Sequence, residues 1–353
     1  MIMKHNVFLS LAAIAAATLF CSCNKVQSSY EGPVELTVAL SLPTHSAQIE
    51  TKAAGDQSVN DVTIKTMQIF VFDHGTGQLD NCRREEFSPA ATNTATLAAT
   101  LTCTQGTKDL WAVVNWPEDL TVAGAGVNTI AALKAKTAAL SSNAVDALIM
   151  TGSKENVTFA TPAVSETVPV SRLCAAVVVK SVINDMLVPA YRTRVSIIGA
   201  YLMNVPAVQR VDGTVLASDD TNSPLSSWMA VYSRPTSVLL NESFSAVSIP
   251  YGSPAHTTPH TFYTYANNYN ETPGDGTGKS STYLKVVLDV DGTVYYYPVV
   301  LPTLERNKKY EVTLTVNHLG QTDPNDYNPV SSAVLTPSVS VSSWTTIPIA
   351  ETI

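Results

Sequence analysis

The chain has 353 residues, of which 45% are hydrophobic and only 14% are charged, so it is long enough for about two domains with real cores. Its net charge is −8 and it contains no basic block, which argues against nucleic acid as a partner. Few charges together with abundant Ser, Thr and Ala are typical of a secreted β-protein rather than of a cytosolic enzyme.

Residues 1–23 are predicted to be a lipoprotein signal peptide. A short polar start is followed by Val7 to Phe20, an apolar stretch that is too short for a transmembrane helix. The small residue Ser22 precedes Cys23, which we therefore predict to be lipidated and to tether the precursor to the outer membrane. The alternative is a plain secretory signal with an incidental cysteine. No other stretch of the sequence is predicted to span a membrane.

The stretch from residue 34 to residue 52 combines a strand with a cleavable loop. Apolar and other residues alternate over its first nine positions, which predicts a half-buried β-strand. The apolar side of this strand is formed by Val34, Leu36, Val38, Leu40 and Leu42. A polar, turn-rich segment follows and leads to Lys52, after which a trypsin-like protease could cut an exposed loop. We therefore interpret residues 24–52 as a propeptide that carries a removable first strand, whose loss would leave an apolar groove between unpaired strand edges.

Residues 53–167 are predicted to form an N-terminal β-sandwich domain. Met67 to Asp73 has the composition of a core strand, and further strands are expected from Ala95 to Cys103 and from Asp109 to Asn115. Apolar residues recur at helical spacing from Thr129 to Met150, which predicts one or two helical turns packed on the sheet.

The cysteines beyond the signal peptide form an odd set. Cys174 lies in an almost wholly apolar run and is predicted to be a buried free thiol. Cys82 and Cys103 could pair with each other, but no spacing rule requires a disulfide, so the sequence leaves this question open.

Residues 168–353 are predicted to form a C-terminal β-sandwich domain. Its strongest hairpin signal is Asp291-Gly292, the favoured two-residue turn, flanked by strands from Tyr283 to Val290 and from Thr293 to Leu301.

The C-terminal tail, residues 335–353, has the same one-sided pattern as the first strand. Hydroxyl residues alternate with apolar ones from Leu335 to Ser342, with an interruption at Pro337. The apolar residues that we predict to act as a donor strand are Leu335, Val339, Val341, Trp344, Ile347 and Ile349. Addition of such a strand to an open sheet edge is an established recognition mode. On pattern alone, however, the favoured interpretation is an ordinary last strand of a β-sandwich.

Tests for motifs that carry chemistry all fail. Gly274 to Ser280 ends like a phosphate-binding loop, but Pro273 stands where its first glycine is required and the segment that follows is a strand. His256 and His260 are four residues apart, yet Pro259 argues against a helix that would present both to a metal. The sequence also has no nucleophile elbow and no cysteine near a plausible base. We therefore expect no enzymatic activity, no cofactor and no metal.

Several short motifs follow the signal peptide and the cleavable strand along nearly the whole chain. They are MQIFVFD at 67–73, AVVN at 112–115, MTG at 150–152, VSRL at 170–173, FY at 262–263, LERNKKY at 304–310 and VSVSSW at 339–344. In this order and at this spacing they resemble the fimbrillins, structural subunits of the type V, donor-strand fimbriae of some Gram-negative anaerobic bacteria.

The resemblance implies an all-β fold, with a minor helix, of two transthyretin-like β-sandwich domains in tandem. It also implies export as a lipid-anchored outer-membrane precursor, proteolytic removal of the first strand, and head-to-tail polymerisation with other fimbrial subunits into an extracellular fimbrium. The best-known members are cut after Arg, whereas this chain offers Lys52. The maturation protease is therefore expected to have Lys or mixed Arg/Lys specificity.

Three interpretations of the function remain. The favoured one is a structural subunit, in the shaft or at an accessory position, that supports adhesion, because the chain has both a removable strand and a tail. An anchor or tip subunit of a fimbria is the second. The third is a monomeric outer-membrane lipoprotein that binds glycan or another ligand through an aromatic platform of Tyr263, Tyr265, Tyr269 and the tyrosines at 295–297. The sequence identifies neither the adhesion ligand nor the protease.

Overall fold

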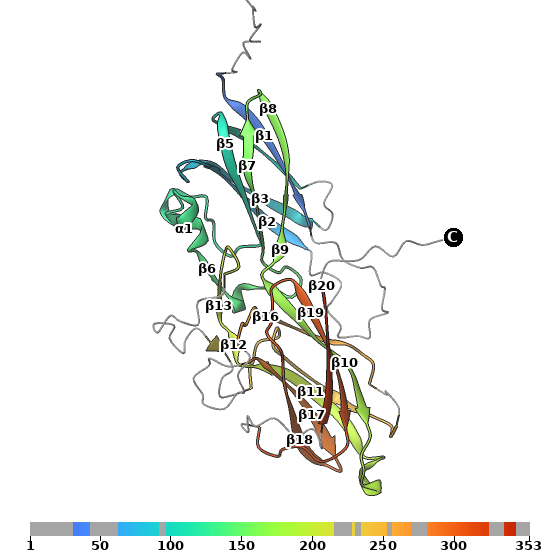
Figure 1. Ribbon diagram of the computed structural model, residues 1–353. Coiled ribbons are helices and arrows are strands. Elements are labelled where there is room, and N and C mark those ends of the chain that lie inside the picture. The colour runs from blue at the N-terminus through green and yellow to red at the C-terminus, as the bar shows by residue number, and fades with distance from the viewer. Residues whose placement is uncertain are drawn as a thin grey trace, which may run out of the picture.

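The computed structural model describes residues 31–42, 63–91, 97–214, 228–229, 234–252, 256–269, 281–324 and 335–343. They form an elongated, nearly all-β molecule in which two β-sandwiches follow one another along the long axis (Figure 1). The fold class predicted from the sequence is confirmed. Within the described residues, no helix is both long enough and apolar enough to cross a membrane.

The N-terminal sandwich packs a three-stranded sheet, in the order β4-β1-β8, against a five-stranded sheet, in the order β3-β2-β5-β7-β9. The strands of the smaller sheet are β1 (Val34–Ser41), β4 (Ala98–Cys103) and β8 (Ala163–Pro169). Those of the larger sheet are β2 (Ile64–Asp73), β3 (Leu79–Ala91), β5 (Gly106–Val114), β7 (Met150–Phe159) and β9 (Ser171–Arg172). One apolar cluster, to which both sheets contribute, fills the space between them.

Strand β2 shows why one segment of the sequence is apolar almost without interruption. Met67, Ile69 and Val71 belong to the core shared with β1, whereas Phe70 and Phe72 belong to a second cluster on the opposite face. That second face is covered by short helical segments, which are η2 (Ala123–Ala125), α1 (Ile130–Lys134) and η3 (Leu140–Ser142). A strand that is covered on both faces is apolar at nearly every position. The helical turns predicted from residue 129 onward are confirmed as part of this cover.

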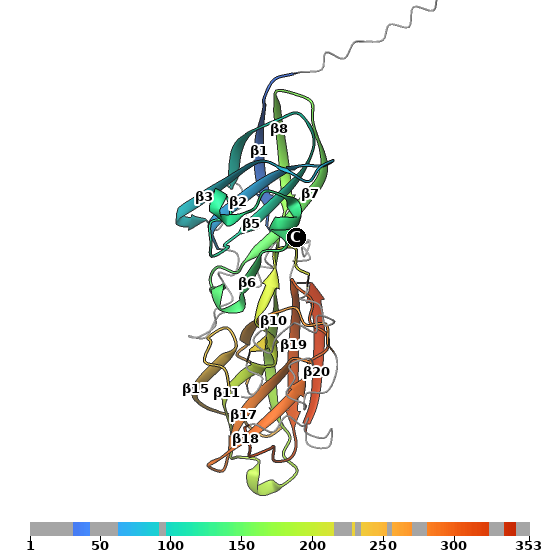
Figure 2. The same cartoon turned by 90° about the vertical axis from the view of Figure 1, so that its left-hand side faces the viewer.

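The C-terminal sandwich consists of two four-stranded sheets, in the orders β16-β10-β19-β20 and β15-β11-β17-β18 (Figure 2). The first contains β10 (Cys174–Asn184), β16 (His260–Tyr265), β19 (Lys308–Val316) and β20 (Leu335–Ser343). The second contains β11 (Val195–Met203), β15 (Asn241–Ser248), β17 (Tyr283–Val290) and β18 (Thr293–Val300). The remaining elements are η4 (Pro189–Tyr191) and two short pairs, β6 (Thr137–Ala139) with β13 (Val208–Arg210) and β12 (Val205–Pro206) with β14 (Trp228–Met229).

The hairpin predicted at Asp291-Gly292 is confirmed. It joins β17 to β18, and the two turn residues have positive φ angles of 57° and 81°. A two-residue turn of this kind needs left-handed backbone at both positions, which Asp and Gly adopt more readily than other residues.

The chain passes from the first sandwich to the second within three residues. β9 still pairs with β7, whereas Cys174 opens β10 in the second sandwich. We propose that the domain boundary lies at Leu173, slightly after the position 168 predicted from the sequence, because strand pairing assigns Ser171 and Arg172 to the first sandwich.

The structure answers the question of the cysteines. Cys82, Cys103 and Cys174 are all free, and Cys174 is fully buried, as predicted. Cys103, on β4 beside β1, lies in the core between the two sheets, whereas Cys82 packs against the cluster on the other face of the larger sheet. A sheet therefore separates the two thiols that the sequence allowed to pair.

Candidate functional site

Strand β1 is buried as deeply as any part of the N-terminal core. Val34, Leu36 and Val38 have no exposed surface, and Leu40 and Leu42 are 2% and 7% exposed. All five belong to the apolar cluster between the two sheets. The alternate residues, such as Glu35 and Ser41, are exposed, so the one-sided pattern predicted from the sequence is confirmed.

The backbone of β1 is paired along both edges. β4 runs antiparallel to it, with Leu36 opposite Leu101, and β8 runs parallel to it, with Leu40 opposite Val168. Because β1 lies in the middle of its sheet, its loss would expose two unpaired strand edges and an apolar trough between them. Such a trough accepts an extended chain that offers apolar side chains at every second residue.

The tail residues 335–343 form β20, the antiparallel partner of β19 at the edge of its sheet. Val339 lies opposite Val312 and packs against the core of the C-terminal sandwich. By itself, therefore, the subunit uses this part of the tail as an ordinary last strand, which is the interpretation that the pattern alone favoured. β1 and β20 lie in different sandwiches and do not pair within the subunit.

The remaining residues predicted for the site lie outside the part of the chain that the structure describes. They are Cys23, Lys52, Trp344, Ile347 and Ile349. Their assignments as lipidation site, cleavage site and distal part of the donor strand stay predictions.

Three of the six tyrosines considered for an aromatic ligand platform are core residues, whereas Tyr269, Tyr295 and Tyr296 are half-buried. Tyr263, Tyr265 and Tyr297 are at most 1% exposed and belong to the main apolar cluster. The Tyr265 hydroxyl accepts a hydrogen bond of 2.9 Å from Asn143 and donates one of 3.2 Å to the Ala139 carbonyl. Side chains fixed in this way cannot form an exposed stacking surface.

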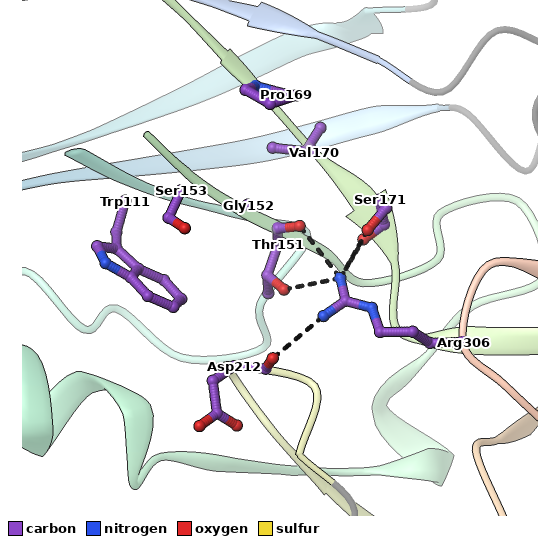
Figure 3. Close-up of a pocket in the computed structure, with 9 residues that line it drawn as sticks. All are labelled: Trp111, Thr151, Gly152, Ser153, Pro169, Val170, Ser171, Asp212 and Arg306. Carbon is purple, nitrogen blue, oxygen red and sulfur yellow. Dashed lines mark hydrogen bonds between the residues drawn. The ribbon is translucent and has the colours of Figure 1, made fainter. Parts of the chain in front are cut away.

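Arg306, in the turn between β18 and β19, joins the two sandwiches (Figure 3). Its Nη2 donates to the carbonyl and hydroxyl oxygens of Ser171, at 3.0 and 2.8 Å, and to both oxygens of Thr151, each at 3.2 Å. Its Nε and Nη1 donate to the carbonyls of Arg172 and Asp212, each at 3.3 Å. Burial lowers the pKa of the Arg306 guanidinium. A planar fork of donors suits such divergent acceptors better than a lysine ammonium does.

Several fimbrillin-like motifs of the sequence meet at this junction. Thr151, Ser171 and Arg306 each come from a different motif, and together they line a cavity of about 300 Å³ with Trp111 (Figure 3). Gly152 leaves no space for a side chain, because an added Cβ would overlap the Pro169 carbonyl. The sequence identified these motifs but could not show that they meet in space, since they are separated by up to 155 residues.

Two asparagines of the same motifs hold left-handed turns. Asn115 has a φ of 56°, and its amide nitrogen donates to the carbonyls of Thr63 and Leu148 at 2.8 and 3.0 Å. Asn307 has a φ of 55°, and its backbone nitrogen donates to the Cys174 carbonyl at 2.8 Å. Asn tolerates this backbone region better than most residues, so the motif positions are explained by chain geometry.

We expect Arg306→Lys to lower the free energy of unfolding by about 2 kcal/mol, because hydrogen bonds from a charged group contribute roughly 1.5–3 kcal/mol and a lysine cannot make all of them. Urea unfolding measures the change. Arg194→Lys is the matched control, since Arg194 is 55% exposed in an ion pair with Asp291, and exposed pairs contribute at most about 1 kcal/mol. Equal losses in the two variants would contradict the role of Arg306.

Two histidines, His256 and His260, lie between β15 and β16 of the C-terminal sandwich. His256 Nε2 lies 2.6 Å from His260 Nε2, and His260 Nδ1 lies 2.8 Å from a carboxylate oxygen of Glu242. The ring of Phe244 stacks on both imidazoles. Burial, and then the charge of His260, lower the pKa of His256 to about 4, although Glu242 acts in the opposite direction. Among the described residues, no group of three or more His, Cys, Asp or Glu side chains could hold a metal ion.

We expect the protein to lose stability as the pH falls from about 6.5 to about 4. His256 is neutral in the folded state, whereas it binds a proton near its ordinary pKa of 6.5 when unfolded. Above pH 6.5, His256 is neutral in both states and does not lower the free energy of unfolding. Between pH 6.5 and pH 4 that free energy decreases by about 3 kcal/mol in total, because the unfolded chain binds a proton that the folded protein does not bind. Urea unfolding at pH 7 and pH 4.5 measures it. His256→Gln should flatten this dependence and the exposed control His318→Gln should not; equal slopes in both would contradict the assignment.

Comparison with known proteins agrees with this geometry. Residues 34–177 match the family model described as major fimbrial subunit protein (FimA). The fold is similar to that of a putative cell adhesion protein from Bacteroides eggerthii, with 21% identity, a TM-score of 0.62, and coverage of 90% of this chain and 98% of that one. It is also similar to a fimbrilin from Porphyromonas gingivalis, with 16% identity, a TM-score of 0.60, and coverage of 89% and 98%.

A third similar structure is a putative cell adhesion protein from Parabacteroides distasonis, with 14% identity, a TM-score of 0.59, and coverage of 91% of this chain and 99% of that one. No curated protein sequence matches the chain. The match of residues 34–177 begins at the first residue of β1 and ends within β10. The resemblance to the fimbrillins is thus confirmed: residues 34–177 match the model of the major fimbrial subunit (FimA) family, and most of the chain has the fold of a fimbrilin.

Proposed function

We propose that the protein is a structural subunit of a cell-surface fimbria that polymerises when the tail of one copy replaces β1 of the next. The observation that carries this proposal is the position of β1. It is the first described strand of the chain, it fills the middle of a sheet, and its four apolar side chains, together with Leu42 just after it, complete a core. Cleavage after Lys52 would detach it from the rest of the subunit.

The directions of the strands support a head-to-tail arrangement. β1 begins at the outer end of the N-terminal sandwich, where Glu35 bonds to Pro162 in the turn before β8, and its end at Ser41 bonds to Val170 near the junction. β20 begins opposite Val316, at the far end of the C-terminal sandwich near η4 (Figure 1). A tail released there would enter the next subunit from the Val34 end and run in the direction of β1. It would then be antiparallel to β4 and parallel to β8, as β1 is.

Treatment with trypsin tests this function directly. Purified precursor that is cut after Lys52 should give a ladder of heat-resistant oligomers on a gel and by size exclusion, because head-to-tail addition does not close on itself. A monomer that stays a monomer after confirmed cleavage would favour a ligand-binding surface lipoprotein instead. Of the fimbrial roles, we propose a shaft or accessory position over an anchor or tip, because a shaft subunit needs both a groove and a tail.

We further propose that the precursor is lipidated at Cys23 and reaches the outer membrane before cleavage, so that the lipid leaves with residues 24–52. Radiolabelled palmitate is expected to enter the wild-type precursor and to be absent from Cys23→Ala. Cys21→Ala is the matched control and should still be labelled. Loss of label from the Cys21 variant alone would show that the lipid is attached to Cys21 and that our assignment to Cys23 is wrong.

A further inference from the structure

A short segment between β19 and β20, residues 317–324, is fixed to the C-terminal sandwich independently of the tail. We call this segment the strap. It lies along β18, the edge strand of its sheet, and two backbone hydrogen bonds of 2.7 and 3.0 Å join Tyr296 to Gln321. The Tyr297 hydroxyl donates a third hydrogen bond, of 3.1 Å, to the His318 carbonyl. None of these contacts involves β20.

A buried cation holds the end of the strap. Lys285 on β17 has no exposed surface, and its ammonium donates a hydrogen bond to the Pro324 carbonyl. The same Nζ lies 6.0 Å from the ring centroid of Tyr283 and 5.9 Å from that of Tyr296. The ring faces and the carbonyl replace part of the hydration that the ammonium loses. Burial of an ammonium group is unfavourable unless polar or aromatic groups surround it, so the contact with Pro324 helps to keep the strap against β17.

We propose that Lys285 is a positioning residue for strand donation, which fixes Pro324 as the root of the tail and thereby sets the reach of a released donor strand. The inference rests on the proposed function. Pro324 precedes residues 325–334, which connect the strap to β20. When β20 leaves β19, the contacts of the strap with β17 and β18 stay in place, so the tail is free only beyond Pro324.

Chain dimensions show what this root allows. From Lys285 to Val290, the last residue of β17, five steps along the strand cover about 17 Å. The ten residues 325–334 span at most about 33–36 Å. Leu335 can therefore reach about 16–19 Å beyond the end of the sandwich. This is enough to enter a subunit that lies end to end with the donor, but it restricts the donor strand to positions close to that end.

Shortening the connection tests the root. Deletion of residues 326–331 leaves four residues, or about 13–14 Å, which does not cover the 17 Å or so to the end of the sandwich. After cleavage, the yield of polymer should fall at least about tenfold, because a linker that cannot span its sites gives an effective concentration near zero. Lys285→Met in the same deletion variant should restore polymerisation. This substitution moves the root back to Gln321, which lies beside Tyr296 and only about 10 Å from the end of the sandwich at Val290. The seven residues that then remain before Leu335 span about 23–25 Å, which is enough to pass that end.

Controls separate reach from folding. Replacement of residues 326–331 by six Gly and Ser residues keeps the length and should polymerise like the wild type. Gly320→Val is the second control. Its added Cβ would lie 2.6 Å from the Tyr296 carbonyl oxygen and disturb the strap beside β18, but the contact of Lys285 with Pro324 stays, so this variant should not rescue the deletion. If the deletion blocks polymerisation and Lys285→Met does not restore it, Lys285 does not set the root, although strand donation stands. If the deletion variant polymerises normally, the root does not limit reach and the inference is also overturned, while the Val339 and Val341 variants described below decide donation separately.

Discussion

Subunits that carry Lys52→Ala are expected to accumulate as membrane-tethered precursor and to give no fimbrial polymer. Four aliphatic side chains of β1 and that of Leu42 are buried, and each contributes roughly 1.5–3 kcal/mol, so this segment stabilises the N-terminal sandwich by on the order of 10 kcal/mol. Whole domains are stable by only about 5–15 kcal/mol. A strand that remains covalently attached refills its own groove at high effective concentration, and no donor from another subunit can compete with it.

Gels of unheated cell-surface extracts, together with sequencing of the N-terminus, measure this outcome. Lys65→Ala is the matched control. Lys65 is the next basic residue along the chain, its side chain is 49% exposed, and it forms an ion pair with Asp146. This control should mature and polymerise normally. Normal fibres from the Lys52 variant would refute the cleavage site, though not the fold.

The double variant Val339→Asp, Val341→Asp is expected to fold, to be exported and to be cleaved, yet to give no heat-resistant ladder. The groove left by β1 is lined by residues such as Met67, Ile69 and Leu101, all at most 4% exposed. Two carboxylates placed there would be buried without partners, which is far more unfavourable than the loss of the valine methyl groups. The wild-type donor combines apolar burial with backbone hydrogen bonds of about 0.5–1.5 kcal/mol net each, so its pairing should be slow to reverse.

The opposite side of the tail provides the control. Ser338→Asp, Ser340→Asp carries the same charges on the hydroxyl face, which corresponds to the exposed face of β1, and should still polymerise. A synthetic peptide of residues 335–353 should bind the cleaved Val339, Val341 variant, because its groove is intact. Ladders from that variant equal to those of the wild type would place the donor strand elsewhere.

The strands themselves could be predicted from the sequence because their patterns are local. The alternation from Val34 to Leu42 encodes one buried face, and the structure has that face buried. The turn at Asp291-Gly292 follows from two backbone conformations that few other residues adopt. The class of the fold and the resemblance to the fimbrillins depended on such signals in order along the chain.

Contacts between residues far apart in the sequence were decided by the tertiary structure alone. Arg306 bonds to Thr151 and Ser171 across the junction, and Lys285 bonds to Pro324, but a single arginine or lysine in a sequence shows nothing of its partners. The same holds for the sheet that separates Cys82 from Cys103. It also holds for β20, whose one-sided pattern does not say which sheet it joins. In the single subunit it pairs with β19 at the edge of the C-terminal sandwich, whereas β1 fills the middle of its own sheet in the other sandwich.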